Sequence, residues 1–217
     1  MSASRYPKRK RTLDDVAQGP GKIRSTGDGR LDSAERGRRL LPVIVDELAR
    51  DVPNDTWISC AKSNVASEGF ENISDSQLRN AINRAALWLQ EHVPKSESKV
   101  IAYLGPSDAR YLIFTLAAAK VGMVMFLPAP HNALDTQQEL AETTHSSVLL
   151  RATTYVKDAE DNVRSTAIKG IAVPEQDELL DDTQDKQVAY TKSYEEERRE
   201  PFAILHTSGT THSTWLL

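Results

Sequence analysis

The chain of 217 residues has little cysteine and no long uninterrupted apolar run. Its one cysteine, Cys60, cannot form an internal disulfide, and we therefore expect a reducing, cytoplasmic compartment. The longest apolar stretch, residues 111–130, is broken by Lys120 and two prolines, so no membrane span is expected. The basic N-terminal stretch is not followed by an apolar region, which predicts that it is not a signal peptide.

Several signatures of catalysis are also missing. The five histidines are scattered without the spacing of metal ligands, which predicts no metal site. His206 and His212 flank Ser208, but no glycine stands two residues before the serine, which argues against a hydrolase elbow. The carboxylates of Asp181-Asp182 and 158–161 lie in polar surroundings typical of solvated loops. We therefore predict no catalytic residue in this chain.

The first 37 residues differ in composition from the rest. Serine, glycine and charge dominate residues 1–37, and periodic apolar residues are absent, which predicts a disordered leader. Lys8-Arg9-Lys10-Arg11 is typical of a nuclear-localisation or polyanion-binding cluster. A solvated basic tail is the simpler interpretation, and a nuclear signal remains the alternative. Because the net charge of the whole chain is −4, we do not expect nucleic acid as its partner.

From residue 38 onward, apolar stretches of strand length alternate with helical patterns. Strands are expected over 57–61, 99–104, 123–127, 147–150, 170–173 and 202–205, and helices over 40–49, 74–93, 108–121 and 135–143. This alternation predicts an α/β fold with a largely parallel sheet flanked by helices. Residues 175–200 return to a charged composition, and we interpret them as a solvated linker or frayed helix.

Two helix starts carry capping signals. Ser74 and Gln77 have the spacing of a capping box, with an apolar stripe behind them. Ser107 is expected to cap the helix over 108–121, which is apolar on nearly every side and should therefore be buried. Gly122 is expected to end it.

The last predicted strand runs directly into a hydroxyl-rich loop. Thr207, Ser208, Gly209, Thr210 and Thr211 place four hydroxyls around a glycine. Amide N–H groups of such a loop can converge on an anion while the hydroxyls donate to its remaining oxygens. We predict that these five residues bind a nucleotide phosphate; an ordinary polar loop at a strand end is the alternative.

This loop resembles the phosphate-binding motif of the adenylate-forming superfamily, which includes adenylation domains of nonribosomal peptide synthetases and acyl-CoA ligases. The motif reads roughly T-S-G-T-T-G-x-P-K, and residues 207–211 fit its first five positions. The next glycine is replaced by His212, the proline by Thr214 and the lysine by Trp215. In the family the loop holds the β- and γ-phosphates of ATP. Because the lysine charge is missing, the resemblance implies that this loop binds phosphate more weakly than the family's loop does.

Two earlier segments resemble earlier motifs of the same family. Residues 73–78 are similar to L-T-Y-x-E-L, and residues 119–128 are similar to L-K-A-G-x-x-Y-V-P. Residues 103–111, 127–132 and 205–209 resemble the fungal adenylate-forming reductases, also called NRPS-like proteins.

The resemblance implies a function for the parent protein. Such proteins activate a carboxylic acid with ATP and Mg²⁺, load it on a carrier domain and reduce it with NADPH. Residues 38–217 resemble only the N-terminal portion of the adenylation domain, so we expect a truncated domain that is inactive alone. The alternatives are a non-catalytic interaction protein, nuclear if Lys8 to Arg11 act as a signal, and an intact nucleotide-binding module.

Overall fold

The computed structural model describes residues 38–62, 66–93, 99–129, 134–146, 148–153, 168–181, 183, 186–206 and 214–216. The predicted leader 1–37 and the predicted phosphate-binding loop 207–211 lie outside these residues. The acidic stretch 158–161 and Asp182 also lie outside them.

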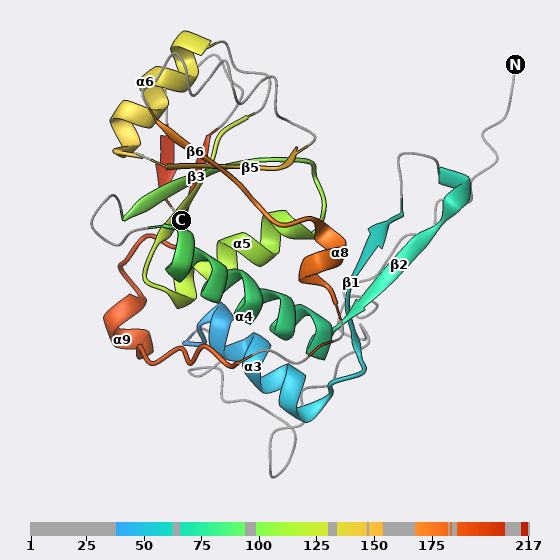
Figure 1. Cartoon of the computed structure of the whole chain (residues 1–217). Coiled ribbons are helices and arrows are strands. Elements are labelled where there is room, and N and C mark those ends of the chain that lie inside the picture. Colours follow the sequence, from blue (N-terminus) through green and yellow to red (C-terminus); the bar gives the residue numbers. More distant parts are fainter. Residues whose placement is uncertain are drawn as a thin grey trace, which may run out of the picture. The chain divides into compact units, whose positions relative to one another are not determined.

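The chain folds around a six-stranded sheet with the strand order β6-β5-β3-β4-β7-β8. Figure 1 labels β6, β5 and β3 of this sheet. Five neighbouring strands are parallel and β8 is antiparallel to β7, which confirms the predicted α/β fold. The strands are β3 (Val100–Leu104), β4 (Val124–Leu127), β5 (Val148–Arg151), β6 (Lys169–Ala172), β7 (Ala203–His206) and β8 (Thr214–Leu216).

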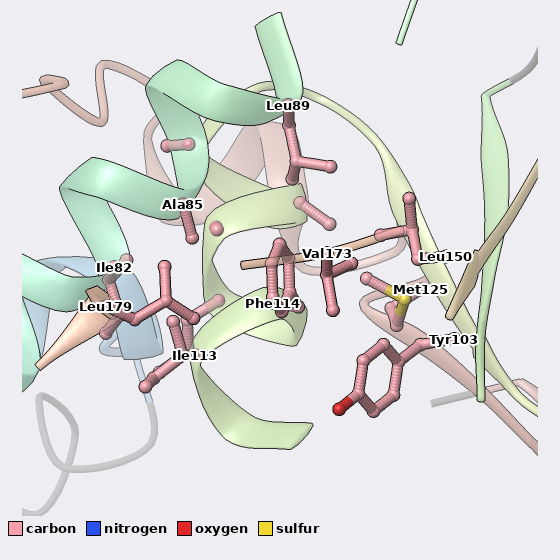
Figure 2. Close-up of a cluster of buried hydrophobic side chains, with 14 of the residues drawn as sticks. Ile82, Ala85, Leu89, Tyr103, Ile113, Phe114, Met125, Leu150, Val173 and Leu179 are labelled. Atoms are coloured by element: carbon pink, nitrogen blue, oxygen red, sulfur yellow. The ribbon is translucent and has the colours of Figure 1, made fainter. Parts of the chain in front are cut away.

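Each face of the sheet carries its own apolar core. Because side chains alternate along a strand, Tyr103 points to one face of β3 and Leu104 to the other. The larger core joins the Tyr103 face to the helical layer, and Figure 2 shows its centre around Phe114. The smaller core joins the Leu104 face to α6 through Leu140. The helices are α3 (Leu41–Asp51), α4 (Asp75–His92), α5 (Ala109–Lys120), α6 (Leu134–Thr144), α8 (Gln176–Leu179) and α9 (Tyr194–Glu197).

The helix starts agree with the sequence at α4 and differ at α5. At α4 the Ser74 hydroxyl accepts from the Gln77 amide at 3.2 Å, and Gln77 Oε1 accepts from the Ser74 amide at 3.0 Å, as the capping box predicts. At α5 the prediction of Ser107 as cap is wrong. Asp108 caps the helix, with Oδ1 accepting from the Arg110 amide at 2.9 Å. A carboxylate at this position also complements the helix dipole.

A separate antiparallel pair, β1 (Thr56–Ala61) and β2 (Phe70–Ser74), leads into α4. The polar composition of residues 62–72 hid β2 from sequence analysis, and Phe70 at its start is 69% exposed. Cys60 lies half-buried on β1 and contacts the larger core. Burial raises the pKa of its thiol, and the charges of Asp108 and Glu71 add to the shift.

The predicted linker over 175–200 is instead partly built into the core. Leu179 of α8 is fully buried. Arg84 of α4 donates to the carbonyl oxygens of Glu178 at 2.7 Å and of Leu179 at 2.8 Å. These bonds satisfy backbone acceptors at the end of α8 that have no partner within the helix. Val188 also packs against the larger core, and its amide donates to Asn83 Oδ1 at 3.3 Å. Residues 198–200 are exposed, as the prediction of a solvated segment expects.

None of the described helices is both long enough and apolar enough to cross a membrane.

Candidate functional site

A cavity lined by described residues lies at the carboxyl ends of β3 and β4. Its volume is about 430 Å³, and it is lined by Tyr103–Gly105, Ser107, Asp108 and Tyr111 on the β3 side and by Leu127–Ala129 on the β4 side. From β3 the chain continues to α5 in the larger core, and from β4 it continues to α6 on the opposite face. Two neighbouring parallel strands that lead to opposite faces leave a crevice between their ends, where ligands commonly bind in α/β sheets.

Aromatic rings form one wall of the cavity. Tyr103 is buried, and its ring centroid lies 5.9 Å from that of Tyr111 in an edge-to-face arrangement. The ring centroid of Phe114 lies 5.8 Å from that of Tyr103, and both rings are labelled in Figure 2. Gly105 makes this packing feasible, since a Cβ there would lie 2.3 Å from the Tyr103 hydroxyl oxygen. Tyr111 is 38% exposed, and burial of the rest raises the pKa of its phenol.

A charged network lies at the rim of the cavity. The Arg110 side chain is only 5% exposed and donates to Asp108 Oδ2 at 2.8 Å through Nη2. Its Nη1 donates to Glu175 Oε2 at 2.7 Å. The Thr153 hydroxyl donates to the other oxygen of Glu175 at 2.5 Å. Because Thr153 follows β5 and Glu175 follows β6, the network ties the start of α5 to the ends of two further strands.

The Glu175 carboxylate is held in its ionised form. The Thr153 hydrogen bond lowers the pKa of Glu175; partial burial opposes the shift, and the Arg110 charge adds to it. The arrangement therefore fixes the β3–α5 turn with a matched set of charges and leaves no unpaired carboxylate at this position.

The predicted phosphate-binding residues Thr207, Ser208, Gly209, Thr210 and Thr211 lie outside the described residues, but both flanks are described. The strand predicted over 202–205 is present as β7, shifted by one residue. It pairs with β4, with Leu127 opposite Leu205. After the loop the chain returns as β8, with His206 opposite Thr214. The end of β7 and the start of β8, which flank these residues, therefore lie at the same edge of the sheet as the cavity. Phosphate binding by residues 207–211 stays a prediction.

The donor set present in residues 207–211 fits phosphate, because hydroxyl and amide groups donate to anionic oxygens. Across the described part of the chain, no group of three or more His, Cys, Asp or Glu side chains is placed to hold a metal ion. Residues 207–211 contain no His, Cys, Asp or Glu, so by their chemistry they fit the phosphate end of a nucleotide better than they fit a metal ion.

Sequence analysis missed the role of Lys120. Its fully buried ammonium donates to both Asp46 carboxylate oxygens, at 2.7 and 2.9 Å, and to Asn83 Oδ1 at 3.0 Å. It also donates to the Val188 carbonyl oxygen at 3.2 Å. The lysine of the second resembling motif thus joins α3, α4 and α5 rather than facing the cavity. A charged residue inside an apolar helix was the signal that could have indicated this.

Comparisons with known proteins bear on these observations. The model of a family described as "AMP-binding enzyme" matches residues 46–212. The isocyanide synthase-NRPS hybrid crmA of Aspergillus fumigatus is 32% identical over 182 residues, and a carboxylic acid reductase of Neurospora crassa is 31% identical over 178 residues. The matches cover 82% and 81% of this chain but 12% and 17% of those proteins, so the chain spans less than a fifth of their length.

A solved structure shares the fold. The fatty acyl-adenylate ligase from L. pneumophila superposes with a TM-score of 0.62 at 16% identity, covering 86% of this chain and 31% of that one. Together with the sequence matches, this agrees with the three resembling motifs. The family match extends over residues 46–212, from α3 to the predicted phosphate-binding loop, and this chain belongs to the AMP-binding enzyme family.

Proposed function

We propose that this chain supplies the nucleotide-phosphate-binding part of a domain that activates a carboxylic acid with ATP. The observation that carries the proposal is the position of β7 and β8. They flank the hydroxyl-rich residues 207–211 at the carboxyl edge of the sheet, and the family match extends to residue 212. A relative named as a carboxylic acid reductase supports an acid as the substrate class.

The chemistry assigned to the loop is electrostatic. Formation of an acyl adenylate brings a carboxylate against the α-phosphate, and two anions repel each other. Magnesium bound with ATP supplies positive charge that reduces this repulsion. In our proposal the hydroxyls of residues 207, 208, 210 and 211 donate to the β- and γ-phosphate oxygens, and Gly209 lets the backbone approach them.

We further propose that the chain does not form an acyl adenylate alone. Trp215 occupies the motif position of a lysine, so an indole stands where the family motif has an ammonium. The carboxylic acid site and the carrier-domain partner would then belong to parts present in the much longer relatives. We expect no ATP–pyrophosphate exchange from this chain with any acid in a panel of aryl and aliphatic carboxylic acids.

Calorimetric titration of the full chain with MgATP tests the phosphate assignment. We expect weak binding that Trp215→Lys strengthens about fivefold, because an added ammonium near the phosphates contributes on the order of 1 kcal/mol in water. The gain should shrink as salt is raised.

Two variants complete this experiment. The double variant Thr207→Ala, Ser208→Ala should weaken MgATP binding at least about tenfold, because two hydrogen bonds to a charged group are lost. Ser59→Ala, which removes an exposed hydroxyl from β1, is the matched control and should change nothing. Unchanged affinity in both Trp215→Lys and the double alanine variant would contradict the proposal.

A further inference from the structure

We propose that the cavity between the carboxyl ends of β3 and β4 binds an uncharged aromatic group. The inference is argued from the lining of the cavity alone and does not depend on nucleotide binding. Nothing in the family match or in the relatives' names assigns a ligand to the cavity.

The dimensions and position of the cavity suit a small organic ligand. Its volume of about 430 Å³ falls within the range of roughly 300–1,000 Å³ that is usual for such sites. It lies where the chain leaves β3 and β4 toward opposite faces of the sheet. This edge is built on buried strands, and therefore the walls contributed by Tyr103 and Leu127 are rigid.

The charges of the described lining residues disfavour an anionic ligand. Among the described lining residues, Asp108 carries the only formal charge, and Arg110 matches it at 2.8 Å. Arg110 also binds Glu175 at 2.7 Å, so its guanidinium is already committed to two carboxylates. A ligand carboxylate or phosphate would find no free cationic partner among the described lining residues and would lose hydration. A neutral ligand avoids this cost.

The side chains of the lining favour a flat ring. Tyr111 is partly exposed at the cavity and stands edge-to-face against the buried Tyr103. A ligand ring can extend this arrangement by packing on the open part of Tyr111, with Leu127 and Pro128 completing an apolar surface. Ser107 is exposed at the same cavity, and its hydroxyl can hydrogen-bond to a polar substituent on the ring.

Two probes with the same ring and different charge test the assignment. The isotope-labelled full chain is titrated with 4-hydroxybenzamide, which is neutral, and with 4-hydroxybenzoate, which is an anion at pH 7, while two-dimensional NMR follows the backbone amides. We expect saturable shifts centred on Gly105, Ser107 and Tyr111, with the benzamide binding at least about tenfold more tightly than the benzoate.

Variants identify the ring contact. Tyr111→Ala should weaken benzamide binding about tenfold. Tyr111→Leu keeps an apolar contact without the ring and should weaken benzamide binding by a smaller factor. This variant replaces Tyr111→Ala in the test if the alanine variant does not fold. Phe70→Ala removes an aromatic ring that is more exposed than Tyr111 and lies on β2 outside the cavity, so it should leave binding unchanged.

Three results would overturn the inference: no saturable shifts at about 10 mM benzamide, equal affinity for the two probes, or full affinity in both Tyr111 variants. None of these measurements contains ATP. A failure here therefore leaves the phosphate assignment intact, and a failure of the calorimetric test leaves this one intact.

Discussion

Helix α5 carries a basic side chain withdrawn from solvent near each end, and the two have different consequences. At its C-terminal end Lys120 is fully buried and holds Asp46 of α3 and Asn83 of α4. Near its N-terminal end Arg110 is 5% exposed but binds Glu175, a partner that is 49% exposed at the rim of the cavity. The Lys120 end of α5 joins elements of the core, and the Arg110 end shapes the rim of the cavity.

The two ion pairs differ in their exposure to solvent, and this explains their different consequences. A buried pair stabilises little in net terms, yet removing one partner leaves the other charge without a counter-ion and is costly. Removing one partner of a pair with an exposed member lowers the free energy of unfolding less, because water and salt ions can solvate the remaining charge. We infer that the Lys120 end governs whether the domain folds, and that the Arg110 end governs the shape of the site.

The largest effect is expected from Lys120→Met. The variant removes the ammonium from Asp46 and Asn83 while keeping an unbranched side chain of similar length. We expect a loss of about 3 kcal/mol in the free energy of unfolding, measured by urea denaturation of the full chain. Arg110→Met should lose only about 1 kcal/mol, because Glu175 can be hydrated.

Lys99→Met is the matched control for Lys120→Met. Lys99 pairs with Glu200 at 3.0 Å, but its side chain is 61% exposed, so the variant should stay within about 0.5 kcal/mol of the parent. Equal losses for Lys120→Met and Lys99→Met would contradict the role assigned to burial, and equal losses for Lys120→Met and Arg110→Met would remove the distinction between the two ends of α5.

Much of the fold could be predicted from the sequence, because the signals involved are local. The apolar stretches of β3, β4 and β7 and the capping box of α4 depend on neighbouring residues alone. The family resemblance was carried by short motifs of the same kind and is confirmed by the match over residues 46–212. The described residues give no support to the alternative of a non-catalytic interaction protein.

The predictions that were wrong or missing depended on distant contacts. Asp108 replaces Ser107 as the cap of α5 where its carboxylate also meets the Arg110 side chain, which in turn reaches Glu175, 65 positions away. The composition of residues 175–200 predicts a linker, but Arg84 donates to carbonyl oxygens at the C-terminal end of α8. The periodicity and composition of a segment carry no information about contacts between residues that are far apart in the sequence.

An intermediate effect is expected from Gly105→Ala at the cavity end. The added Cβ would lie 2.3 Å from the Tyr103 hydroxyl oxygen and 2.6 Å from the ring carbon that bears it, so the buried ring must shift. Overpacking of this kind costs about 1–3 kcal/mol, measurable by urea denaturation. Combining Gly105→Ala with Tyr103→Phe removes the nearer contact and should recover part of the loss. A double variant no more stable than Gly105→Ala alone would show that the hydroxyl is not the obstacle.

The smallest effect is a pH dependence at the rim. The Thr153 hydrogen bond, opposed by partial burial and aided by Arg110, lowers the pKa of Glu175 below its ordinary value of 4.5. A lowered pKa in the folded state stabilises the protein above that ordinary value, and the contribution disappears as pH falls through the folded-state pKa. Glu175→Gln should therefore cost a few tenths of a kcal/mol at pH 7, because the side chain is half exposed. The difference between parent and variant should vanish toward pH 3 in urea denaturation. A difference that grows on acidification would mean that Arg110 and Thr153 do not favour the ionised carboxylate.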